Sequence, residues 1–158
     1  MNNRLSAGGK GASQARGFTL VEMMTVLAVL SILALVAMTS YQDYVLRSQI
    51  SEGIRVAAAH KSGVLSTFYS SGLMPGSNTD AGMDAPIDYN TEYVYSVGIS
   101  SNPRGGTITI SYNILKLGSD NLLQLVPTDN DGIIEWICRP SADNGILTNF
   151  LPSNCRGT

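Results

Sequence analysis

The amino-acid sequence predicts an α+β fold in which one long N-terminal helix packs against a four-stranded antiparallel sheet. Three observations lead to this prediction. A helical pattern without proline extends from about residue 18 to residue 70, and four short runs with alternating apolar residues follow it. Both cysteines lie near the C-terminus, so a disulfide-closed loop is expected there. At 158 residues the chain is long enough for one modest domain and short for two.

Charge is scarce and unevenly distributed along the chain. Charged residues make up 14% of it, well below the usual quarter, and between Phe18 and Met38 the only charge is Glu22. Residues 1–17 carry basic residues and no acid, whereas all 12 acidic residues lie after Phe18. The net charge of −2 and the lack of a Lys/Arg-rich patch give no sign of a general nucleic-acid binder.

A basic head followed by an apolar run is typical of a targeting segment. The positive-inside rule keeps such a head in the cytoplasm and sends the acidic remainder out. As a helix, residues 18–38 span roughly 32 Å, about one bilayer core. We favour a retained anchor, because the small-residue pattern of a cleavage site after the run is poor. A cleaved secretory signal peptide is the alternative.

The helical pattern continues beyond the apolar run. From Tyr41 to Ser70, apolar residues recur in steps of three and four, at Leu46, Ile50, Ile54, Ala57, Ala58, Val64, Leu65 and Phe68. This stripe predicts a rear half of the helix that lies on a core. A domain of this size cannot also bury the front half, which must be covered by something else. His60, alone on this helix, is interpreted as a surface or partly packed residue and not as a catalytic one.

Residues 70–90 are rich in Gly, Ser, Asp and Pro and predict a long loop. The four β-like runs lie near residues 93–97, 108–114, 123–125 and 133–138, and turn motifs separate them. Short links predict an antiparallel meander that packs one face on the rear half of the helix. The alternating tyrosines, Tyr93 and Tyr95, suggest cross-strand packing. The tail from Arg139 to Thr158 reads as irregular.

No motif for catalysis, phosphate binding or dinucleotide binding is present, so the sequence predicts neither an enzyme nor a cofactor. Residues 129–132 resemble the start of a calcium loop, but Pro140 stands where the bidentate Glu belongs. An Asp-Gly hairpin turn is favoured, and no metal site is expected. Cys138 and Cys155 lack the ligand spacing of a zinc or redox site, so one disulfide, worth roughly 3 kcal/mol, is favoured.

Glu22 is the most informative residue of the apolar run. A carboxylate at this place costs a few kcal/mol unless it is paired. One interpretation is local, because Thr19 to Glu22 fits a capping box, and an acid is favourable near a helix N-terminus. The other requires cleavage between Gly17 and Phe18. That cut would create a free α-amine on Phe18, with which Glu22 of the same or an adjacent helix could pair.

The segment Gly17-Phe18-Thr19-Leu20-Val21-Glu22-Met23-Met24, with its apolar run and the following Tyr41-Gln42-Asp43-Tyr44, resembles the N-terminal region of type IV pilins of the type IVa class. Residues 47–53 continue this resemblance. The C-terminal segment from Trp136 to Cys155 is similar to the disulfide-bonded region of the same family. The resemblance covers residues 17–70 closely and residues 133–155 by pattern.

The resemblance implies a prepilin with three parts: a cytoplasmic leader (residues 1–17), a hydrophobic N-terminal helix that serves as membrane anchor and filament core (18–44), and a globular head (45–158). A prepilin peptidase would cut after Gly17 and N-methylate Phe18. Glu22 would pair with a neighbour's Phe18 amine and set the subunit register, and Cys138 would bond to Cys155.

The family further implies storage in inner-membrane lipid and polymerisation with other pilin subunits on a pilus assembly platform. The product would be an extracellular pilus, or fimbrium, for adhesion, twitching motility or DNA uptake. We favour a major, non-enzymatic subunit. A minor pilin or a type II secretion pseudopilin is one alternative, and a Sec-secreted small binding domain or enzyme is a second.

Two departures from the family pattern concern the front of the helix. Most relatives carry a glycine and a proline where this chain has Ser31 and Thr39. Because proline removes a backbone hydrogen bond and glycine weakens a helix, their replacement predicts a helix without a sharp kink near Thr39. The tail from Arg139 to Asn154 is a candidate for the outward or subunit-contact surface of a fibre.

Overall fold

The computed structural model describes residues 17–119 and 121–156. Its helix is α1 (Leu20–Ser71), and its strands are β1 (Val94–Ser100), β2 (Thr107–Tyr112), β3 (Leu122–Asn130) and β4 (Ile133–Pro140). Short 3₁₀ helices are η1 (Pro86–Tyr89), η2 (Leu115–Leu117), η3 (Thr148–Phe150) and η4 (Ser153–Cys155). The predicted long helix and the four strands are confirmed. The predicted leader lies outside the described residues except for Gly17.

The chain divides into two compact units, Met1–Thr39 and Ser40–Thr158, so the front of α1 belongs to the first unit and its rear to the second. α1 is one uninterrupted helix across Ser31 and Thr39. Both hydroxyls donate to a backbone carbonyl one turn earlier, Ser31 to Leu27 at 2.7 Å and Thr39 to Val36 at 3.0 Å. The absence of a sharp kink at Thr39 stays a prediction.

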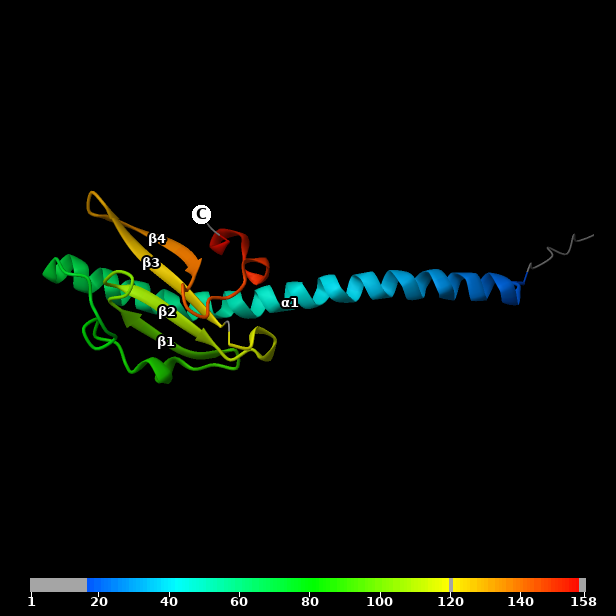
Figure 1. Ribbon diagram of the computed structural model, residues 1–158, viewed down its shortest axis with the longest axis horizontal. Coiled ribbons are helices and arrows are strands. Elements are labelled where there is room, and N and C mark those ends of the chain that lie inside the picture. The colour runs from blue at the N-terminus through cyan, green and yellow to red at the C-terminus, as the bar shows by residue number, and fades with distance from the viewer. Residues whose placement is uncertain (1–16, 120, 157–158) are drawn as a thin grey trace, which may run out of the picture. The chain divides into compact units, whose positions relative to one another are not determined.

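The sheet is the predicted antiparallel meander, with strand order β1-β2-β3-β4 (Figure 1). β3 and β4 pair from Leu123 with Pro140 to Asn130 with Ile133, which leaves a two-residue turn at Asp131-Gly132. Both turn residues have positive φ, 52° and 84°, as a type I′ turn requires. Asp129 Oδ1 accepts a hydrogen bond from the Gly132 N–H at 2.8 Å. The hairpin interpretation of residues 129–132 is therefore confirmed.

One face of the sheet and the rear half of α1 enclose the core of the second unit. The helix contributes Leu46, Ile50, Ala57 and Val64, and the strands contribute Val97, Ile108, Ile110, Leu123 and Leu125. The buried line along the helix follows steps of three and four and includes Gly53 and His60. Ala58 lies beside this line and is exposed, so its assignment to the core was wrong.

Gly53 is where α1 and β2 approach most closely. Tyr112 at the end of β2 is buried, and its hydroxyl donates a 2.6 Å hydrogen bond to the Ile50 carbonyl. A Cβ on Gly53 would lie 2.5 Å from Tyr112 Oη and 2.6 Å from its ring carbons. Burial raises the pKa of Tyr112, so its hydroxyl keeps the proton that it donates. Glycine is needed at this position because the tyrosine occupies the space of its side chain.

We expect Gly53→Ala to lower the free energy of unfolding by about 2 kcal/mol. The overpacking cost of about 1–3 kcal/mol and the strained Tyr112 hydrogen bond exceed the roughly 1 kcal/mol that alanine gains in a helix. Urea unfolding of the full chain in detergent measures this change. Gly63→Ala is the matched control, because its Cβ would meet only Met83 Sδ at 3.0 Å, Met83 Cγ at 3.2 Å and the Ala81 carbonyl oxygen at 3.2 Å, and we expect it to cost less than Gly53→Ala. Equal effects of the two variants would contradict the close approach.

Asn78 covers the free edge of β1. Its side-chain amide donates to the Val97 carbonyl at 3.2 Å and accepts from the Ile99 N–H at 2.6 Å, as a neighbouring strand would. This contact fastens the loop, predicted at residues 70–90 and beginning after Ser71, to the sheet and protects the edge from pairing with another chain. In β1, a register shift between Val94 and Ser96 breaks the predicted alternation. Val94 is therefore buried and Tyr95 is exposed, whereas the cross-strand packing of the tyrosines stays a prediction.

Candidate assembly site at the start of the N-terminal helix

A capping box starts α1. Thr19 precedes the helix, and its hydroxyl oxygen accepts a hydrogen bond from the Glu22 N–H at 3.2 Å. In return, Glu22 Oε2 accepts from the Thr19 N–H at 3.0 Å and from the Thr19 hydroxyl at 2.9 Å. The local interpretation of Glu22 is therefore confirmed. These bonds hold the Glu22 carboxylate at the start of the helix, four residues after Phe18.

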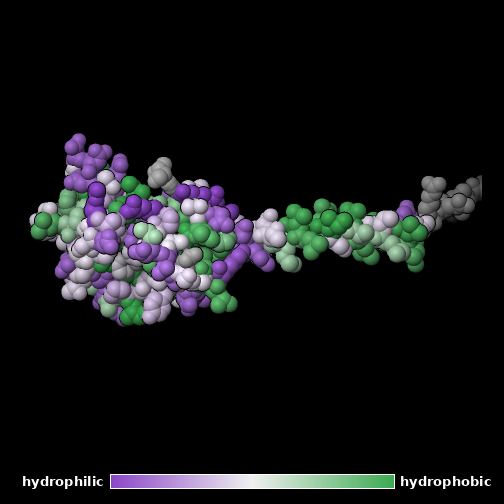
Figure 2. Space-filling view, in the orientation of Figure 1, coloured by the Kyte–Doolittle hydropathy of each residue, from purple (hydrophilic) through white to green (hydrophobic). Residues whose placement is uncertain are grey.

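Beyond Glu22, the first unit is an apolar helix without a covering layer. Every residue from 17 to 39 is exposed, and the large apolar side chains are between 51% (Val26) and 78% (Phe18) exposed. Figure 2 shows this stretch as predominantly hydrophobic. By length and composition, α1 can cross a membrane. Thr25, Ser31 and Thr39 donate to backbone carbonyls of the same helix, so their hydroxyls need no water.

His60 is wholly buried, which corrects its interpretation as a surface or partly packed residue. It lies on the core-facing line of α1, and its ring meets the Tyr89 ring edge-on at 4.3 Å between centroids. Neither ring nitrogen makes a hydrogen bond to a described residue. Burial lowers the pKa of His60, and the nearby backbone of Val56 and Val97 offsets this in part. A ring so enclosed cannot reach a substrate.

Acid should destabilise the second unit through His60. Because the pKa of His60 lies below 6.5 in the folded chain, only the unfolded chain takes up this proton as pH falls just below 6.5. The free energy of unfolding is therefore undiminished at pH 7.5. As the pH falls below 6.5 it decreases by at most about 1.4 kcal/mol per pH unit. Urea unfolding at pH 7.5 and 5.5 measures the loss. His60→Phe should abolish it, and an equal loss in both proteins would contradict this assignment.

The C-terminal tail is tied to the rest of the second unit by covalent and hydrogen bonds. Cys138 on β4 and Cys155 in η4 form the predicted disulfide. The Ile146 N–H donates to the Leu122 carbonyl at 3.1 Å, and Leu151 is buried. The Arg47 guanidinium on α1 donates to the Asn149 carbonyl at 3.1 Å. The predicted irregular tail began too early, because Arg139 and Pro140 belong to β4; residues 141–156 are irregular apart from η3 and η4, and they are a fixed part of the second unit.

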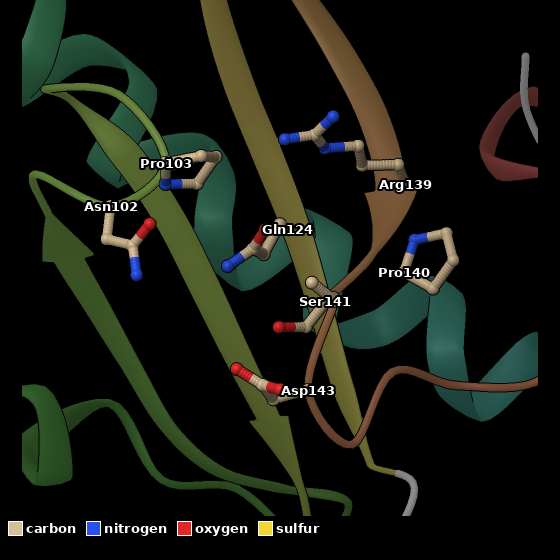
Figure 3. A pocket seen from close by; sticks show the side chains of 8 residues that line it. Asn102, Pro103, Gln124, Arg139, Pro140, Ser141 and Asp143 are labelled. Atoms are coloured by element: carbon tan, nitrogen blue, oxygen red, sulfur yellow. The ribbon is translucent and has the colours of Figure 1, made fainter.

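A polar pocket of about 260 Å³ lies on the sheet face that points away from the core. Figure 3 shows its labelled side chains, which come from the β1–β2 loop, β3, β4 and the start of the tail: Asn102, Pro103, Gln124, Arg139, Pro140, Ser141 and Asp143. Sequence analysis did not find this pocket. The pairing of Gln124 with Arg139 across β3 and β4 places both side chains on one face, and that pairing depends on strand register.

Comparisons with known proteins agree on one family. Residues 46–156 match the family Pilin (bacterial filament), and residues 12–38 match the prokaryotic N-terminal methylation motif. The chain is 40% identical over 145 residues to the fimbrial protein EcpC of Eikenella corrodens, covering 89% of this chain and 90% of that protein. It is 34% identical over 157 residues to the type IV major pilin protein PilE of Neisseria gonorrhoeae, covering 89% of this chain and 93% of that protein. This chain, with its exposed apolar helix front, antiparallel meander and disulfide-bonded tail, therefore belongs to the pilin family of structural filament subunits.

Proposed function

We propose that this chain is the major subunit of a type IV pilus and has a structural role without catalysis. The observation that carries this proposal is the apolar front of α1, which is exposed throughout residues 17–39. So large an apolar surface must be removed from water. Lipid covers it while the subunit is stored, and the helices of neighbouring subunits cover it in the fibre. The type IV major pilin among the relatives supports the assignment to the bulk subunit.

The start of α1 fits processing by a prepilin peptidase. Gly17 and Phe18 precede the helix and are exposed, so the backbone between them is accessible. The peptidase cuts after Gly17 on the cytoplasmic side and methylates the new Phe18 amine. The match to the methylation motif over residues 12–38 supports this assignment.

We expect Gly17→Ala to block cutting largely. A Cβ on Gly17 would meet no atom within 4 Å, so the substitution leaves the structure of the chain itself unchanged. Loss of cutting would then report on the fit to the peptidase, where a missing side chain lets the backbone approach closely. Intact mass measures whether residues 1–17 remain on the chain. Normal cutting of Gly17→Ala would show that the site lies elsewhere.

Cutting changes the surroundings of Glu22. The new α-amine of Phe18 lies four residues from the carboxylate and gives it a cationic partner, on its own helix or on a neighbour's. In a water-free fibre core an unpaired carboxylate is expensive, so a pair between subunits selects one register among many. We assign Glu22 this role in assembly.

The remaining parts of the proposal concern place and partners. The subunit waits in inner-membrane lipid, and a pilus assembly platform transfers it into a homopolymeric fibre on the cell surface. The transfer exchanges one apolar environment for another, so it needs no exposure of the helix to water. A fibre of this kind serves adhesion, twitching motility or DNA uptake.

The proposal is tested by deleting the gene and complementing it in its own host. Surface fibres are sheared from the cells and their protein is separated by mass. The proposal predicts that this chain is the main band and that the deletion removes the fibres. A trace amount in fibres of normal abundance would identify a minor subunit. A soluble chain that starts after Met38 would identify a Sec-secreted domain.

A further inference from the structure

The long loop before the sheet carries only negative charge. Between Lys61 and Arg104 the chain has no Lys or Arg but has four acids, Asp80, Asp84, Asp88 and Glu92. Glu92 raises the pKa of Tyr93 by hydrogen bonding and charge, and Asp80 Oδ2 accepts a hydrogen bond from the Gly76 N–H. Asp84 and Asp88 are exposed, and their carboxylates make no hydrogen bond or ion pair with a described residue. We call these two residues the acidic pair.

The backbone under the acidic pair is held in place. The Asp84 carbonyl accepts a hydrogen bond from the Asn78 amide at 2.9 Å, and the Asp84 N–H donates to the Tyr89 hydroxyl at 3.2 Å. The Asp88 N–H donates to the Ala85 carbonyl at 2.9 Å within η1. Asn78 in turn is bound to β1. The two carboxylates therefore stand on a fixed backbone, which lowers the entropic cost of binding a partner.

Two exposed arginines lie on the outer face of the sheet. The polar pocket adjoins a second pocket of about 180 Å³, and the two share Pro103 and Arg139. Arg104 lines the second pocket, beside Val126, Thr128 and Ile137. The guanidinium groups of Arg104 and Arg139 make no hydrogen bond or ion pair with a described residue, and Figure 3 shows Arg139 extending from β4 toward the β1–β2 loop. We call these two residues the arginine pair.

We propose that, in the fibre, the acidic pair of one subunit binds the arginine pair of a neighbouring subunit. This inference rests on the proposed function, because it needs copies of the chain at high density. Guanidinium groups bind carboxylates with two parallel hydrogen bonds, and each side has two charges of one sign. The surfaces are different parts of the molecule, so the contact is heterologous and extends into a filament without closing on itself.

Asp143 makes one side of the arginine pair unfavourable for a carboxylate. It lines the first pocket together with Arg139, whereas the second pocket holds both arginines and no acid. A neighbour's carboxylates are thus repelled at the Asp143 end and attracted at the Arg104 end. Like-charge contacts of this kind exclude wrong registers in protein interfaces.

Charge reversal and its rescue test the contact in the full chain and its own host. One variant carries Asp84→Arg with Asp88→Arg, a second carries Arg104→Glu with Arg139→Glu, and a third carries all four changes. Each two-site variant should reduce the ratio of sheared fibre to total chain about tenfold, because like charges then meet. The four-site variant should recover most of the wild-type ratio, because the attraction returns with the charges exchanged.

A matched control separates this contact from general effects of charge. Arg55→Glu reverses an exposed charge outside both pairs and should leave the ratio unchanged. As a measurement without mutations, wild-type fibres should release subunits faster as salt rises from 0.1 to 1 M, since screening weakens exposed ion pairs.

Three results would overturn the inference: normal fibres from either two-site variant, a four-site variant as defective as the worse two-site variant, or salt-independent release. Each of these leaves the proposed function standing, because fibres of this chain are still present. Absence of this chain from wild-type fibres would instead overturn the proposed function.

Discussion

Glu22→Leu should reduce incorporation into fibres to a trace while membrane insertion stays normal or improves. Insertion improves because the substitution removes the only charge of the apolar run. In the proposed pairing, Glu22→Leu leaves the Phe18 amine of a neighbour without a partner in the fibre core, and truncating one partner of a buried charge pair costs about 3–5 kcal/mol. The measurement compares the chain in sheared fibres with the chain in membranes.

Thr19→Val is the control that separates assembly from capping. It removes the hydroxyl that accepts from the Glu22 N–H but keeps the carboxylate. Loss of an N-cap costs about 1 kcal/mol, which a helix of this length tolerates. We therefore expect normal fibres from Thr19→Val. Equal loss of fibres in both variants, or normal fibres from Glu22→Leu, would show that Glu22 acts only as a helix cap.

Replacing both cysteines by serine should lower the free energy of unfolding of the second unit by about 3 kcal/mol. The disulfide closes a loop between residues separated by 17 positions, and its loss restores the conformational freedom of that loop in the unfolded chain. The tail would then be held only by contacts such as Ile146 with Leu122 and Arg47 with Asn149. Urea unfolding of the full chain in detergent measures the change.

Reductant supplies the control for this prediction. It should destabilise the wild-type chain by the same amount and leave the Cys138→Ser/Cys155→Ser variant unchanged. A thiol-alkylating reagent should add no mass to the native chain until it is reduced. Alkylation of both cysteines without reductant would contradict the bond.

The helix and the meander could be predicted because local patterns encode them. The proline-free pattern from residue 18 to 70 and the turn at Asp131-Gly132 are properties of neighbouring residues, and both are present in the structure. The capping box of Thr19 and Glu22 also lies within four residues. The length of the apolar front of α1 and its single charge, Glu22, also predict it from sequence alone.

What escaped prediction depends on contacts between distant residues. Gly53 is buried because Tyr112, 59 positions later, occupies its side-chain space, and no local pattern carries that information. Asn78 is buried because β1 has a free edge at that place. His60 is the exception: steps of three and four place it between Ala57 and Val64 on the buried line, so the local pattern itself indicated its burial. The arginine pair could not be predicted because it depends on the pairing register of β4, which places Arg139, and on the position of the β1–β2 loop, which places Arg104.

The intact mass of the chain in sheared fibres tests the central claim most directly. We predict a subunit that begins at Phe18, carries one added methyl group and has its two cysteines joined. We also predict that this species dominates the fibre. A fibre subunit that retains residues 1–17, or a mature chain that begins after Met38, would contradict the account.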